Sequence, residues 1–184
     1  LRILVGSDGK RGVKTKVEPT LQEAPGVYND TILAGLDYLL MEMGKRKMLA
    51  VLYLNNSWEW SGGYGYYLEQ AGMGKAPRPN EDGYPAFMNF VAKYASCEKA
   101  HQLFHDYVKF ILTRTNRYTK KKYKDDPAIM SWQIGNEPRA FSKEQLPAFE
   151  KWLGEASKLI RSLDKNHLIS IGSEGKWGCE GELN

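Results

Sequence analysis

Cysteine is scarce in this sequence: only Cys97 and Cys179 occur among its 184 residues. Two cysteines are too few for a disulfide framework, and their separation does not match the spacing of metal ligands. With 42% hydrophobic residues, the chain has instead the composition of a globular segment that folds around an apolar core. We therefore expect neither a metal site nor a cofactor, and we interpret both cysteines as buried residues without a chemical role.

Long apolar runs are also missing. No stretch approaches the roughly 20 consecutive apolar residues that cross a bilayer, so no membrane span is predicted. Leu1 opens an apolar run directly, without the charged leader and cleavage site of a signal peptide. We expect the sequence to be either a mature chain or one that lacks its N-terminal part.

An excess of charge of one sign is absent too. The net charge is only +4, from 26 basic and 22 acidic residues, which does not indicate a nucleic-acid partner. The densest basic run, residues 120–124, is followed at once by Asp125 and Asp126, and we interpret it as a solvated loop. No apolar run is followed by a G-x-G-x-x-G motif or a P-loop, which argues against a nucleotide-binding sheet.

The sequence does contain a regular alternation of two periodicities. Short apolar runs predict strands at residues 1–5, 48–54, 128–134 and 167–171. Helical spacing of apolar residues predicts helices at residues 29–44, 98–116 and 142–163. Because each helix returns the chain to start the next strand in the same direction, the alternation predicts a parallel sheet. Residues 57–85, rich in glycine and aromatics, are expected to form a long loop of the kind that usually carries function.

Polar residues follow every predicted strand: Ser7-Asp8, Asn55-Asn56, Asn136-Glu137 and Ser173-Glu174. In a (β/α)8 TIM barrel these strand ends share one face, which is the active-site face. Such a barrel needs eight strands, so we expect residues 1–184 to form about half of one catalytic domain, strands two to five, without a second domain. We also expect the helices to cover one face of the sheet. The other face should be lined with apolar residues that find no partner within this chain, because the remainder of the barrel would cover them.

Glu137 is the first candidate for chemistry. A glutamate just past a buried strand lies at the rim of a pocket, where partial burial favours a protonated carboxyl group. A protonated carboxyl group can donate its proton to the glycosidic oxygen, which then leaves more easily. Asn136 offers an amide to a sugar hydroxyl, and Arg139 offers a planar donor fork. The tetrapeptide alone is equally compatible with a helix-capping turn.

The surrounding sequence makes the assignment specific. Residues 132–139, with residues 123–130 before them, resemble the fourth strand of glycoside hydrolase family five, and within it the endo-β-1,4-mannanase subfamily. Further stretches match other strands of that family in order and spacing: residues 1–3 the second strand, residues 52–58 with 62–63 and 66–67 the third strand and its loop, and residues 167–170 with 172–175 the fifth.

The resemblance implies a role for each matched position. Glu137 would be the catalytic acid/base, and Asn136 would bind the 2-hydroxyl of the sugar before the cut. Arg2 would support the nucleophile. The expected substrate contacts are Asn55, Trp58 as a sugar platform, and Arg139 with Glu174 in the subsites past the cut. Trp177 could be a further platform, but we expect it to pack within its loop.

The implied reaction is retaining hydrolysis of β-1,4-mannosidic bonds in mannan, glucomannan or galactomannan. It needs two carboxylates roughly 5–5.5 Å apart. The family's nucleophilic glutamate belongs to the seventh strand, which this sequence does not contain, and Glu180 and Glu182 follow the fifth strand too closely to replace it. The alternatives are an endo-β-1,4-glucanase, an exo-β-mannosidase with a subsite blocked by residues 57–85, and a non-catalytic glycan-binding barrel. The resemblance also implies a secreted, periplasmic or cell-surface location.

Overall fold

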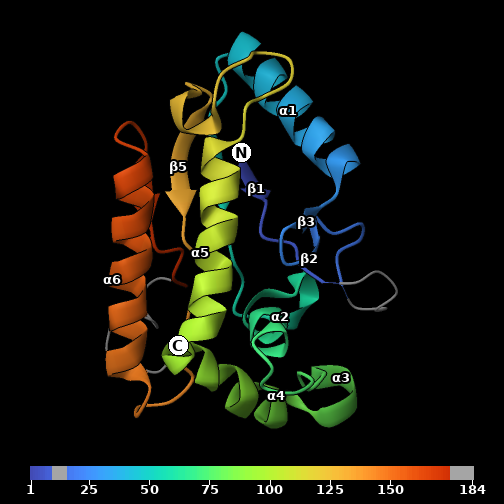
Figure 1. Cartoon of the computed structure of the whole chain (residues 1–184), viewed down its shortest axis with the longest axis vertical. Helices are drawn as coiled ribbons and strands as arrows, with labels where there is room; N and C mark the ends of the chain where they lie inside the picture. The colour runs from blue at the N-terminus through green and yellow to red at the C-terminus, as the bar shows by residue number, and fades with distance from the viewer. Residues whose placement is uncertain (10–15, 175–184) are drawn as a thin grey trace.

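The computed structural model describes residues 1–9 and 16–174. Its centre is a parallel four-stranded sheet in the order β1-β4-β5-β6 (Figure 1), formed by β1 (Arg2–Leu4), β4 (Ala50–Tyr53), β5 (Ile129–Gln133) and β6 (Leu168–Ser170). Leu52 of β4 lies in register with Ile3 on one side and with Trp132 on the other. The predicted strand–helix alternation and parallel pairing are therefore confirmed.

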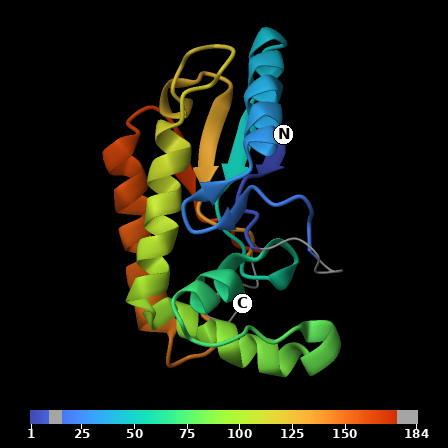
Figure 2. The same cartoon turned by 45° about the vertical axis from the view of Figure 1, so that its right-hand side comes forward.

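Long helices cover one face of this sheet, as expected (Figures 1 and 2): α1 (Asp30–Lys45), α5 (Glu98–Thr113) and α6 (Leu146–Leu163). Asn29 caps α1, because its side-chain oxygen accepts hydrogen bonds from the backbone N–H groups of Thr31 and Ile32 at 3.1 and 3.2 Å. Helix α6 begins at Leu146 rather than at residue 142. Its proline lies in the first turn, where no intrahelical N–H partner is needed.

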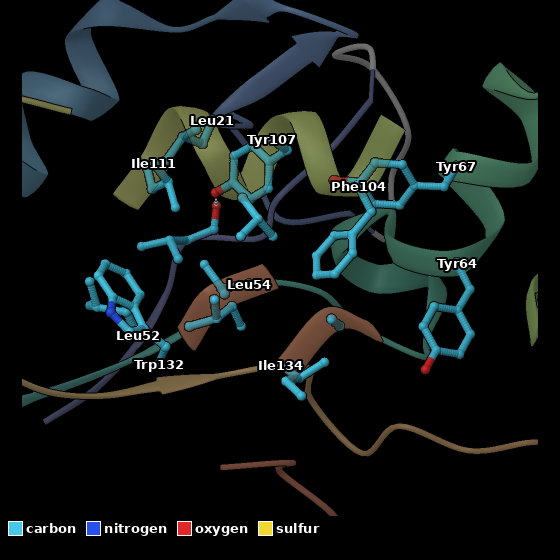
Figure 3. Packing of buried hydrophobic residues seen from close by; sticks show 14 of the residues in the cluster. Leu21, Leu52, Leu54, Tyr64, Tyr67, Phe104, Tyr107, Ile111, Trp132 and Ile134 are labelled. Carbon is cyan, nitrogen blue, oxygen red and sulfur yellow. Dashed lines mark hydrogen bonds between the residues drawn. The ribbon is translucent and has the colours of Figure 1, made fainter. Parts of the chain in front are cut away.

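The core lies between the sheet and these helices. Leu52 and Trp132 are fully buried on the helix-facing side, together with Phe104 and Ile111 of α5. Figure 3 shows these side chains interleaved. Tyr107 of α5 donates a hydrogen bond to the backbone oxygen of Val5, just past β1, and so fixes the helix to the end of that strand.

The opposite face of the sheet contradicts the prediction of an apolar surface. Arg2 donates from Nε to Oε1 of Gln133 at 2.7 Å, and its guanidinium lies 4.1 Å from the centre of the Tyr53 ring. Gln133 in turn donates to the hydroxyl of Ser170 at 3.3 Å. Arg2 of β1 thus reaches across β4 to β5, and Gln133 pairs with the neighbouring β6. The prediction was wrong because it treated each strand as an apolar run and ignored the alternation of its two faces.

Residues 57–85 also differ from the expected open loop. The structure places here η1 (Glu59–Ser61), α2 (Gly63–Gln70), α3 (Pro79–Asp82) and the start of α4 (Tyr84–Val91), which η2 (Ala92–Ser96) continues. Gly63 has a φ of +54°, and a Cβ there would lie 2.0 Å from the backbone oxygen of Asn56. The glycine therefore permits a close approach of two backbones. Figure 1 shows this helical segment at the carboxyl ends of the strands.

Two smaller elements were not predicted. The first is an antiparallel hairpin of β2 (Gln22–Ala24) and β3 (Val27–Tyr28), and the second is the short helix η3 (Tyr123–Asp125). Both are too short to produce a readable periodicity. The hairpin lies beside α2 at the carboxyl end of the sheet (Figures 1 and 2).

Asp37 joins α1 to the segment that follows α5. Its fully buried carboxylate accepts two hydrogen bonds from Arg114, at 3.1 and 2.6 Å, and one from the hydroxyl of Tyr123 at 2.6 Å. Arg117 adds a longer contact at 3.3 Å. Buried charges of this kind are tolerated only when paired and hydrogen-bonded. This cluster stabilises the end of the sheet opposite to the polar strand ends.

The same carboxylate should make the fold sensitive to acid. Burial alone would raise the pKa of Asp37, but hydrogen bonds from Arg114 and Tyr123 outweigh it and hold the pKa below its ordinary 3.8. A carboxyl group with a lowered pKa in the folded state stabilises the fold at pH values above its pKa in the unfolded state. This stabilisation is lost as the pH falls through the pKa of the folded state. We expect Asp37→Asn to have a lower free energy of unfolding than the parent at neutral pH. This difference in free energy should become smaller below about pH 4. Urea unfolding of the full-length protein and of the variant at a series of pH values measures this difference. A difference in free energy of unfolding that does not change with pH would refute the prediction.

Candidate active site

The polar residues after β4, β5 and β6 are held together by backbone pairing beyond the strands. Asn136 donates its N–H to the oxygen of Asn55 at 2.8 Å, and Ser57 donates to the oxygen of Asn136 at 3.1 Å. Glu137 donates its N–H to the oxygen of Gly172 at 3.0 Å. The three strand ends thus form one connected edge, and the side chains on it have little freedom to move apart.

Glu137 occupies an unusual backbone conformation at this edge. Its φ is +50°, in the left-handed region that residues other than glycine rarely adopt. Such outliers are often found where a side chain must be aimed at a site. The half-buried carboxylate accepts a hydrogen bond from the indole Nε1–H of Trp58 at 2.6 Å. The backbone and this hydrogen bond together fix the position of the Glu137 carboxylate.

Asn136 lies next to Glu137 and is almost fully buried. Its Oδ1 accepts from Nη2 of Arg2 at 2.9 Å, and its Nδ2 donates to Oδ1 of Asn56 at 3.1 Å. The amide is therefore fixed in orientation between two strands. The exposed Arg2 also binds Gln133, so one arginine links β1 both to the last residue of β5 and to Asn136 beyond it.

Arg139 and Glu174 form an ion pair at the same edge, so the structure brings these two expected site residues together. The Arg139 guanidinium lies 4.9 Å from the centre of the Trp58 ring, within the range of a cation–π contact. Trp58 thus contacts both Glu137 and Arg139. Its ring also packs against Phe87 at 6.2 Å and edge-on against Phe141 at 5.7 Å between centroids.

Asn55 does not belong among the substrate contacts, and that prediction was wrong. Its side chain is fully buried, donates to the hydroxyl of Tyr94 at 3.1 Å, and accepts from the N–H of Asn56 at 2.8 Å. No part of it reaches the surface of the edge. The sequence places a polar residue after the strand, but which way the side chain turns depends on the packing of Tyr94, far along the chain.

Asp8 lies at the same edge of the sheet but is likewise buried away from the surface. Burial raises the pKa of its carboxyl group to about 7, against the opposing effects of a hydrogen bond from Gln22 and the charge of Lys16. The Gln22 amide donates to Oδ1 at 2.9 Å. Asp8 therefore ties β1 to the β2–β3 hairpin and does not extend the candidate site.

Sequence reasoning missed three features of this edge. Asn56 and Gln133 orient Asn136 and Arg2, and Trp58 binds Glu137 in addition to its expected role as a platform. A glutamine in an otherwise apolar strand was a usable signal for Gln133. Trp177, Cys179, Glu180 and Glu182 lie outside the described residues. Cys97 is a half-buried free thiol, less enclosed than predicted.

Among residues 1–9 and 16–174, no helix combines the length and apolar character of a membrane span. Over the same ranges, no group of three or more His, Cys, Asp or Glu side chains is arranged to hold a metal ion.

Comparison with known proteins identifies the family of this chain. The model described as "GH family 5 beta-mannosidase-like" matches residues 1–183. The chain belongs to glycoside hydrolase family 5. It is 37% identical over 158 residues to mannan endo-1,4-beta-mannosidase 4 of Solanum lycopersicum, covering 86% of this chain and 37% of the relative.

Solved family 5 structures have the same fold. A family 5 mannosidase from Rhizomucor miehei superposes with a TM-score of 0.85 at 35% identity, over 95% of this chain and 42% of that one. An endo-β-1,4-mannanase from Thermotoga petrophila superposes with a TM-score of 0.76 at 26% identity, over 95% of this chain and 36% of that one. These neighbours are (β/α)8 barrels, so the four strands correspond to part of that barrel, as predicted. The family 5 chain spans about two fifths of the length of such relatives.

Proposed function

We propose that this family 5 chain is part of an endo-acting β-1,4-mannanase that cleaves mannans with retention of anomeric configuration. Residues 1–184 would supply part of a single catalytic domain, and the remainder of the barrel would supply the nucleophile. The observation that carries the proposal is the placement of Glu137, held by Trp58 at the carboxyl edge of the sheet beside the Arg139–Glu174 pair. The family and the names of its mannan-cleaving relatives support the choice of substrate.

Glu137 would act twice in this reaction. Its carboxyl proton passes to the glycosidic oxygen as the bond to the sugar breaks and the nucleophile forms a glycosyl ester. The resulting carboxylate then takes a proton from water as that water attacks the ester. The Trp58 N–H would donate to Oε2 of the carboxylate left after the proton transfer, and a charge-assisted hydrogen bond of this kind is stronger than a neutral one.

Arg2 and Asn136 would organise the sugar before the cut. Asn136 is oriented by Arg2 and Asn56, so its remaining hydrogen-bonding capacity points in a fixed direction. Arg2 itself would support the nucleophile of the missing strands, a role that suits an exposed guanidinium on the barrel-facing side of the sheet.

Arg139 and Glu174 would bind the sugar past the cut, and Trp58 would form an apolar surface beside it. The ion pair places donors and acceptors side by side, which suits the mixed hydroxyls of a sugar. We further propose that the enzyme acts outside the cytoplasm, where its polysaccharide substrate occurs.

Exo action on chain ends is the second candidate, because the matching family model is beta-mannosidase-like and the Rhizomucor miehei structural neighbour is a family 5 mannosidase. Phe87 of α4 packs on Trp58, which binds Glu137, so this helical segment lies beside the site and would be able to block a subsite. The early products of linear mannohexaose separate the two: the endo enzyme should release mannobiose and mannotriose first. Mannose as the sole early product would favour the exo enzyme. No cleavage of mannan would contradict the proposed function altogether.

A further inference from the structure

The fully buried side chain of Asn56 connects two residues of the candidate site. Its Oδ1 accepts hydrogen bonds from the side-chain Nδ2 of Asn136 and from the backbone N–H of Trp58, both at 3.1 Å. Asn136 is the expected contact of the sugar before the cut, and the Trp58 indole donates to the Glu137 carboxylate. One oxygen atom thus contacts both the residue that would bind the sugar and the residue that holds the expected acid/base.

The nitrogen end of the Asn56 amide is bound by Ser61, the last residue of η1. Nδ2 of Asn56 donates to the hydroxyl oxygen of Ser61 at 2.9 Å, and Ser61 is fully buried as well. The backbone oxygen of Ser61 accepts from the N–H of Asp8 at 2.8 Å, which attaches η1 to the segment after β1. Ser61 therefore holds Asn56 from a part of the fold that is itself fixed.

The direction of every hydrogen bond in this chain is determined. A guanidinium has donors and no acceptor, so Arg2, whose Nη2 lies 2.9 Å from Asn136, must face the oxygen of that amide. Nδ2 of Asn136 then faces Asn56, which must present its own oxygen. The backbone N–H of Trp58 imposes the same orientation on Asn56, and Nδ2 of Asn56 is left to face Ser61. Turning over either amide would place donor against donor in a buried site, at the cost of unsatisfied polar groups.

We propose that Asn56 and Ser61 are positioning residues of the reaction, a role that rests on the proposed mannanase function and deepens it. They act first through Asn136, whose fixed amide presents an N–H of Nδ2 to the 2-hydroxyl of the sugar before the cut. Hydrogen bonds to this hydroxyl strengthen in the transition state of glycoside hydrolysis. Loosening the amide therefore lowers kcat more than it raises KM. They act second through the backbone of Trp58, which sets the place of the indole that binds Glu137.

Ser61→Ala in the full-length enzyme tests this role with a small change of shape. The matched control is Ser7→Ala, because Ser7 is also buried and its hydroxyl oxygen accepts the N–H of Leu21 at 2.9 Å, outside this chain. The substrates are an activated aryl β-mannoside and its 2-deoxy analogue, and the ratio of their kcat/KM values measures the contribution of the 2-hydroxyl. Ser61→Ala should lower this ratio by about fivefold, mainly through kcat, as expected for one weakened hydrogen bond. Ser7→Ala should keep the parental ratio although it loses a buried hydrogen bond of the same length.

Two changes at Asn56 separate the direction of its hydrogen bonds from its packing. Asn56→Asp keeps an oxygen toward both donors, and the Ser61 hydroxyl can donate to the second oxygen, so the ratio should stay close to the parental one. Asn56→Leu has a similar shape but no acceptor, and it should lower the ratio more than Ser61→Ala does. It should also slow mannan hydrolysis more than aryl mannoside hydrolysis, because an acidic leaving group depends less on a well-placed Glu137.

A parental ratio in both Ser61→Ala and Asn56→Leu would overturn the inference. A loss in Asn56→Asp as large as that in Asn56→Leu would also overturn it, because the acceptor would then not be what matters. If Asn56→Leu fails to fold, the comparison of Ser61→Ala with Ser7→Ala decides alone, and equal losses in these two contradict the role. If the parent cleaves no β-mannoside, the proposed function itself fails, which is a separate result.

Discussion

Glu137→Ala in the full-length enzyme should reduce hydrolysis of mannan by roughly a thousandfold, the usual contribution of a positioned general acid–base. Binding of manno-oligosaccharides should change little, because Glu137 acts mainly in the transition state. The matched control is Glu150→Ala, an exposed glutamate on α6 that should retain parental activity.

The leaving group distinguishes a lost acid from a damaged fold. An aryl mannoside with a very acidic leaving group needs little protonation, so Glu137→Ala should slow its first step far less than it slows mannan hydrolysis. Equal losses on both substrates would indicate a general structural defect. Mannan cleavage at the parental rate would exclude Glu137 as the acid/base.

Arg139→Ala should weaken cleavage of manno-oligosaccharides that occupy the subsites past the cut. One or two lost hydrogen bonds, at roughly 0.5–3 kcal/mol each, correspond to a several-fold to hundredfold loss of kcat/KM. An activated aryl mannoside should be nearly unaffected, because its leaving group does not reach these subsites. Arg139→Lys keeps the charge but not the planar fork, so it should restore only part of the activity.

The comparison of these two substrates also tests whether Arg139 acts through its neighbours. The guanidinium lies over Trp58, and Trp58 donates to Glu137. If Arg139→Ala slowed both substrates equally, the effect would have passed through Trp58 to the acid/base. That result would contradict a role confined to the sugar past the cut.

The architecture was predictable because its signals are local. Apolar runs and helical spacing marked the strands and long helices, and Asn29 marked the start of α1. The segment containing α2 to α4 was not predictable in this way. Gly62 and Gly63 were interpreted as part of a long loop, whereas they permit close contact with the backbones of Asp8 and Asn56. Only the tertiary fold shows whether a glycine belongs to a loop or permits the close approach of two backbones.

The site was predictable to the extent that strand ends converge. Glu137, Asn136 and the Arg139–Glu174 pair lie together because parallel strands bring their carboxyl ends to one edge. Asn55 shows the limit of this reasoning, since a side chain at the same edge can turn into the core. The contact of Trp58 with Glu137 joins residues 79 positions apart in the sequence, and no local sequence pattern predicts a contact over such a separation.

The central claim is that Glu137 is the acid/base of a retaining mannanase, and the product formed by Glu137→Ala in the presence of azide tests it most directly. With the carboxylate removed, azide can occupy its place and attack the glycosyl ester without needing a general base. Retention through two displacements predicts β-mannosyl azide, identified by the anomeric configuration of the isolated product in NMR, together with faster turnover. Formation of α-mannosyl azide would instead identify Glu137 as the nucleophile, and the absence of both adduct and rescue would contradict the assignment.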